Sequence, residues 1–248
     1  MTVSRLSSVL FSALVIALFC CGNSTAVASI QTGDIIRIGD GPGSPGGIFY
    51  LQDAGGNKID DTFCVQLEEF IRFDRTYLVT NIGTTTAGAG SRPLTSFAAW
   101  IFDRYLNGVA GSGPALSNFD FTNNYGQQNL AAARIQANEL QLAIWEAMGY
   151  LPLEIGGAGN GGWYDTYDGK LAAWEVEFNN DLANNLWAGT GDIFVLNLLR
   201  QNGAGNYTIH VQDQLVRIPS DVIPEPVSLM VWSTLGILMV VAFRLKRS

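Results

Sequence analysis

The sequence predicts an α+β fold in which a helical middle, about residues 93–187, packs on a β-sheet or sandwich formed by N-terminal and C-terminal strands. Short runs rich in β-branched and aromatic residues occur early and late in the 248-residue chain, whereas apolar residues at helical spacing occupy its middle. A third observation, an uncharged apolar segment at residues 227–243, adds a single C-terminal transmembrane helix. The absence of internal repeats argues against a solenoid or a propeller.

Four short strands are expected before the helices and two after them. The first two flank a turn rich in glycine and proline at residues 39–47. Because strands both precede and follow the helices, we expect the first and last strands to share a sheet. The expected strands span residues 34–38, 48–52, 62–67, 76–82, 193–199 and 207–218.

Three helices are expected between these strands, at residues 93–106, 129–148 and 170–187. In the first, Phe97, Trp100 and Tyr105 recur at helical spacing and define one apolar face. The second has the clearest helical pattern, and Gly149 is a typical residue to end it. The middle of the chain is therefore predicted to be helical.

The first 28 residues have the features of a signal peptide. Arg5 supplies a positive charge, and residues 9–19 form an apolar run that is too short to span a bilayer. Ala28 completes a small-x-small cleavage motif. We therefore expect cleavage after Ala28 and export of the rest of the chain, in which residues 29–220 form one domain.

The C-terminal residues 221–248 combine three features in a fixed order. Pro224-Glu225-Pro226 comes first, the apolar residues 227–243 follow, and a short basic tail ends the chain. This order resembles the PEP-CTERM sorting signal of Gram-negative bacteria that make exopolysaccharide. The resemblance implies processing by an exosortase, an intermediate anchored in the inner membrane, and a final place at the cell surface or in the extracellular matrix.

The exported domain is acidic and contains few reactive side chains. Residues 29–223 carry ten basic and 21 acidic side chains, which argues against nucleic acid as a partner. Cys20 and Cys21 leave with the signal peptide, so the exported domain contains one cysteine, Cys64, and one histidine, His210. This pair is too small for the usual zinc site, and we expect neither a metal nor a cofactor.

Cys64 and Gln141 together suggest a specific chemistry. The neighbours of Gln141 at helical spacing are all apolar: Ala137, Ile144, Trp145 and Met148. Gln141 is therefore expected in the core, where an amide without partners costs about 1–3 kcal/mol, so it has either good hydrogen bonds or a chemical role. Cys64 stands in an apolar segment of its own. A thiol and an amide form an internal thioester when the sulfur attacks the amide carbon and ammonia leaves.

The segment Phe63-Cys64-Val65, followed later by a helix with the pattern Gln-x-Ala-Ile-Trp at residues 141–145, resembles the thioester domain of bacterial surface adhesins. That family usually has threonine where this chain has Leu140. The resemblance implies that Cys64 and Gln141 are the thioester partners. It places Phe63, Ile144 and Trp145 in the surrounding pocket.

The function implied is adhesion by covalent attachment to amine or hydroxyl groups on a surface or matrix partner, such as a biofilm matrix. Each bond forms once, so the protein is not expected to be a turnover enzyme, and no catalytic residue is assigned. The main alternative is a structural module, or one that binds exopolysaccharide noncovalently, without a thioester. Aromatic residues near the third helix, at Trp163, Tyr164 and Tyr167, are candidates for sugar stacking.

Three simpler interpretations remain open from the sequence. Cys64 can be an ordinary core residue, since free cysteine is among the most buried residue types. Cys64 and His210 can form a pair like that of papain, although the usual local signature is missing. The scattered acidic residues Asp60-Asp61, Asp165 and Asp168 can bind calcium weakly, but they do not form an EF-hand loop.

Overall fold

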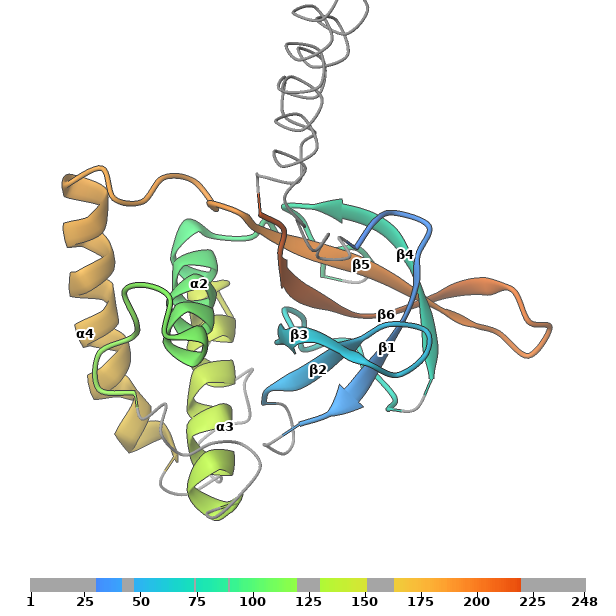
Figure 1. The fold of residues 1–248 in the computed structure, drawn as a ribbon, viewed down its shortest axis with the longest axis horizontal. Helices are drawn as coiled ribbons and strands as arrows, with labels where there is room; N and C mark the ends of the chain where they lie inside the picture. The colour runs from blue at the N-terminus through green and yellow to red at the C-terminus, as the bar shows by residue number, and fades with distance from the viewer. Residues whose placement is uncertain are drawn as a thin grey trace, which may run out of the picture.

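The computed structural model describes residues 30–41, 47–73, 75–88, 90–119, 130–150 and 163–219, with the side chains of residues 130–132 and 163–169 left undescribed. Six strands and three helices lie within these ranges. Figure 1 shows the helices gathered on one side of the molecule and the strands on the other.

The strands form one six-stranded antiparallel sheet in the order β3-β2-β1-β4-β5-β6. Their bounds are β1 Ile35–Asp40, β2 Phe49–Gln52, β3 Lys58–Thr62, β4 Thr76–Gly83, β5 Ile193–Gln201 and β6 Tyr207–Arg217. The pairing of β4 with β5 joins the N-terminal and C-terminal strands. Buried and partly exposed residues alternate along β1, as expected for a strand with one face in the core.

The segment after β3 closes the gap between the two edges of this sheet. Leu215 on β6 donates its main-chain N–H to Phe63 at 3.0 Å, and Val65 donates to Asp213 at 3.1 Å. Cys64 lies opposite Gln214 between these two bonds. The strand expected at residues 62–67 is therefore a single bridge at Cys64 that follows the end of β3 at Thr62.

The helices are α2 Ser96–Ala110, α3 Leu130–Ala147 and α4 Trp163–Ala183. The hydroxyl of Thr95 accepts a hydrogen bond from the N–H of Ala98 and so caps the start of α2. Gly111 ends the same helix with φ 61°, a left-handed conformation that glycine adopts without strain. The helices expected at residues 93–106 and 170–187 begin and end three to seven residues away from α2 and α4, whereas the one expected at 129–148 differs from α3 by one residue at each end.

The core lies between the helices and the sheet. Helix α3 contacts both α2 and α4, and α2 also contacts β5. Every residue from 137 to 145 on α3 is buried, including the polar Asn138, Glu139 and Gln141. A helix that is buried on all sides must satisfy its polar side chains inside the protein. Helix α3 is consequently the element that brings polar groups into the core.

The expected fold class needs correction, because the sandwich is wrong and the transmembrane helix has no support among the described residues. The strands form one continuous antiparallel sheet with three helices, and no second sheet of a sandwich occurs among the described residues. The reason is that β6 pairs with both β5 and the Cys64 segment. The C-terminal transmembrane helix is unsupported, since the described residues contain no helix long and apolar enough to cross a membrane.

Several expected features fall outside the described residues. These are the signal peptide at residues 1–28 with its cleavage site at Ala28, the motif Pro224-Glu225-Pro226, and the apolar segment 227–243.

Candidate functional site

Cys64 is fully buried, in a segment whose main-chain groups face two different neighbours. In an antiparallel ladder, successive residues direct their N–H and C=O groups to opposite sides of the strand. Phe63 and Val65 use theirs to pair with β6. Those of Cys64 therefore point to the other side of the strand, toward α3.

Gln141 on α3 satisfies both of these main-chain groups. Its Oε1 accepts a hydrogen bond from the N–H of Cys64 at 3.1 Å, and its Nε2 donates to the carbonyl oxygen of Cys64 at 2.7 Å. The two residues are 77 positions apart in the chain, and Gln141 is only 1% exposed. The structure thus brings the two expected partners together in a dry environment.

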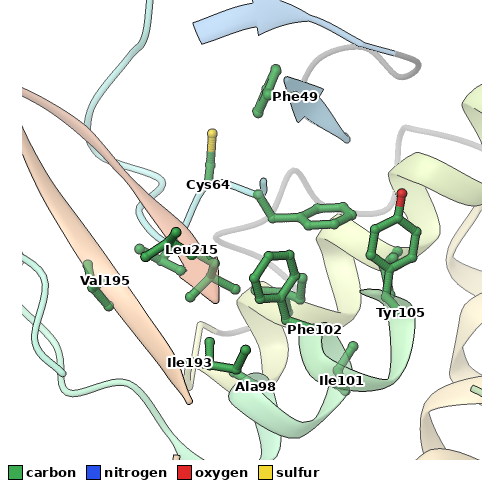
Figure 2. Close-up of a cluster of buried hydrophobic side chains, with 14 of the residues drawn as sticks. Phe49, Cys64, Ala98, Ile101, Phe102, Tyr105, Ile193, Val195 and Leu215 are labelled. Carbon is green, nitrogen blue, oxygen red and sulfur yellow. The ribbon is translucent and has the colours of Figure 1, made fainter. Parts of the chain in front are cut away.

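The thiol of Cys64 has a separate partner on β6. Gln214 places its Nε2 3.3 Å from the Cys64 sulfur, and Gln214 is itself fully buried. In Figure 2 the sulfur points away from Phe102 and Tyr105. Burial raises the pKa of the thiol far above its usual value, and the hydrogen bond from Gln214 opposes that rise. The thiol is therefore protonated at neutral pH.

The three residues expected to line the pocket have different surroundings. Phe63 packs edge-on against Phe102 and Tyr105, with ring centroids 5.9 and 5.3 Å away. Ile144 and Trp145 are both buried on α3, three and four residues after Gln141, which places them on the same side of the helix. Trp145 has a buried indole N–H with no hydrogen-bond partner among the described residues.

Sequence reasoning missed Gln214 and its neighbour Asp213. The carboxylate of Asp213 accepts hydrogen bonds from the main-chain N–H groups of Ala87 at 2.6 Å and Leu198 at 3.0 Å, and from the Asn197 side chain at 2.8 Å. Burial raises the pKa of Asp213 to about 7 although these bonds lower it. The available signal was Gln212-Asp213-Gln214, three consecutive polar residues between the apolar Val211 and Leu215 of the expected strand.

The structure bears to different extents on the other interpretations from the sequence. His210 is exposed on β6, whereas Cys64 is buried and its sulfur contacts Gln214, so the two do not form a catalytic pair. Within the described ranges, no group of three or more His, Cys, Asp or Glu side chains could hold a metal ion. Trp163, Tyr164 and Tyr167 belong to the first turns of α4, where side chains are not described.

Comparisons with known proteins found no match to this chain among family models, curated proteins or solved structures.

Proposed function

We propose that the protein forms an internal thioester between Cys64 and Gln141 and uses it to attach covalently to an amine or hydroxyl group on a surface or matrix partner. One observation carries the proposal, namely the pair of hydrogen bonds that holds the Gln141 amide against the Cys64 peptide group. The Gln141 amide is thereby held against the residue that carries the thiol, in a buried site, and this favours the proximity that such a reaction needs.

The first step exchanges one bond for another. The Cys64 sulfur bonds to the side-chain carbon of Gln141, the bond from that carbon to Nε2 breaks, and the thiol proton leaves on the nitrogen as part of ammonia. In the second step an amine attacks the same carbon. A stable amide forms on Gln141, and the Cys64 thiol returns with a proton from the amine.

The main chain of Cys64 supports the first step electrostatically. Negative charge develops on Oε1 of Gln141 as the sulfur attacks, and the N–H of Cys64 already donates to that oxygen at 3.1 Å. A donor fixed in a site without water stabilises such a charge strongly. Burial also protects the thioester from hydrolysis.

The localisation, processing and partner of the protein are proposed from its sequence. The signal peptide and the sorting motif support an exported protein of a Gram-negative bacterium that is processed by an exosortase and reaches the cell surface or extracellular matrix. The acidic domain supports a partner that carries amines rather than nucleic acid. Each molecule reacts once, so this is adhesion and not turnover.

The test is the intact mass of the purified protein, followed by incubation with methylamine. We expect the wild-type chain to lack one ammonia, and methylamine to be found on Gln141 after incubation. Cys64→Ala should keep the full mass and take up no methylamine. Gln136→Met, on the same helix, is the matched control and should behave as wild type. A wild-type chain with its full mass and no uptake would refute the proposal.

A further inference from the structure

We infer that Gln214 is a catalytic residue of this reaction, because its side-chain N–H donates to the Cys64 sulfur and stabilises negative charge there when the sulfur attacks Gln141 and again when it leaves. The inference rests on the proposed function and adds to it a third reacting side chain. Gln214 lies 73 positions after Gln141, on β6 instead of α3.

The orientation of the Gln214 amide follows from its surroundings. The same terminal atom that lies 3.3 Å from the sulfur lies 3.2 Å from the carbonyl oxygen of Gln212. A carbonyl oxygen accepts hydrogen bonds only, so this atom must be the nitrogen of the amide. One hydrogen of this nitrogen is donated to the carbonyl oxygen of Gln212, and the other can be donated to the Cys64 sulfur.

Burial and the strand pairing fix the position of this side chain. The single hydroxyl hydrogen of Thr62 goes to the carbonyl oxygen of Leu215 at 2.6 Å, and Oε1 of Gln214 lies 3.4 Å from the same hydroxyl. Gln214 is fully buried, and its position opposite Cys64 is set by the bridge between the two strands. The donor is therefore positioned before any reaction begins, as preorganised catalysis requires.

The environment of the sulfur explains why a donor matters there. Burial disfavours the thiolate and raises the pKa of Cys64, while the Gln214 hydrogen bond lowers that pKa. Gln214 is the one side chain among the described residues with a hydrogen bond to this sulfur. Charge that builds up on the sulfur, in either direction of the acyl transfer, therefore depends on this N–H.

The test compares Gln214→Met with Gln212→Met in the full chain. Both changes replace a buried glutamine of β6 by an apolar side chain of similar length, but Gln212 donates its side-chain amide to the carbonyl oxygen of Gln66 and not to the sulfur. The first measurement is the rate of methylamine incorporation at Gln141. We expect Gln214→Met to slow it about 10- to 100-fold, as for the loss of one hydrogen bond to a charged group. Gln212→Met should stay within a few-fold of wild type.

The second measurement does not need the thioester. In a Gln141→Ala background the thiol is free, and the pH dependence of Cys64 alkylation by iodoacetamide, followed on the Cys64 peptide, reports thiolate formation. Adding Gln214→Met should move this profile to higher pH, whereas adding Gln212→Met should leave it in place. A structural role alone would not separate the two profiles in this way.

The two measurements distinguish failure of the inference from failure of the proposed function. Equal methylamine rates in Gln214→Met and wild type, or coincident alkylation profiles, would overturn the role of Gln214 while leaving the thioester intact. A wild-type chain that loses no ammonia would instead refute the thioester and, with it, a catalytic role for Gln214. In that case a shifted alkylation profile would show only that Gln214 stabilises the thiolate.

Discussion

The side-chain amide of Gln141 pairs with the main chain of Cys64 as the peptide group of a neighbouring strand would. It accepts from the N–H at 3.1 Å and donates to the carbonyl oxygen at 2.7 Å. Helix α3 thereby satisfies the free side of the Cys64 segment, whose other side pairs with β6. The same contact gives Gln141 a structural role and holds its amide against the main chain of the residue that carries the thiol.

The structural part of this role can be measured without the thioester. In a Cys64→Ala background, which keeps both main-chain groups, Gln141→Met should leave a buried N–H and a buried C=O unpaired. We expect the free energy of unfolding in urea to fall by about 2–4 kcal/mol, since each unpaired group costs about 1–3 kcal/mol. Gln136→Met on the same helix should cost far less, because its buried Oε1 has no partner among the described residues. Equal losses would contradict the pairing.

Asp213 should make stability depend on pH. Burial raises its pKa to about 7, so between about pH 4 and 7 the folded protein holds a proton that the unfolded chain has lost. The contribution of this group to stability is therefore fully present below about pH 4 and is lost as pH rises to 7, which amounts to roughly 4 kcal/mol. In Asp213→Asn this contribution should vanish, which urea unfolding across the same pH range would show. An unchanged slope in the variant would contradict the assignment.

Asp181 joins α4 to α2. Its carboxylate accepts a 2.7 Å hydrogen bond from the indole N–H of Trp100 and pairs with Arg104, both on α2. Asp181→Ala should lower the free energy of unfolding by about 2–4 kcal/mol, since it leaves two largely buried donors unpaired. Glu175→Ala, an exposed position on the same helix, should change it by less than about 0.5 kcal/mol. Thermal or urea unfolding distinguishes the two.

Thr95 joins the start of α2 to the end of α3. Its hydroxyl accepts from the N–H of Ala98 at 3.1 Å and donates to the carbonyl oxygen of Ala147 at 2.7 Å. Thr95→Ala should cost about 1–2 kcal/mol of stability, as for loss of a helix cap. Thr95→Ser retains the hydroxyl and should retain most of that stability. If both variants lost the same amount, the hydroxyl would not be the stabilising group.

Local patterns were sufficient for most of the regular elements. The spacing of Phe97, Trp100 and Tyr105 predicted α2, and these residues lie on its buried side or pack against the core. Apolar neighbours placed Gln141 in the core, where it is found. The strand expected around Cys64 was wrong because apolar residues alone do not determine whether a segment has strand neighbours on both sides. Here β6 lies on one side and a helix side chain on the other.

The interior partners of Cys64 could not be inferred in the same way. Gln214 was missed because its contact with the sulfur depends on the register between β6 and the segment after β3, residues 150 positions apart. Asp213 was missed because its raised pKa depends on burial against β5 and the loop at Ala87. The local sequence does not specify such long-range pairings, and its only signal here is the run of polar residues Gln212-Asp213-Gln214 within β6.

The sequence by itself determined that one cysteine remains in residues 29–220 and that Gln141 is surrounded by apolar residues on its helix, since both follow from composition and helical periodicity. Only the tertiary structure decided that these two residues meet, and that Gln214 contacts the Cys64 sulfur. The physical reason is that hydrogen bonds between distant segments depend on strand register and helix packing, which no local pattern specifies.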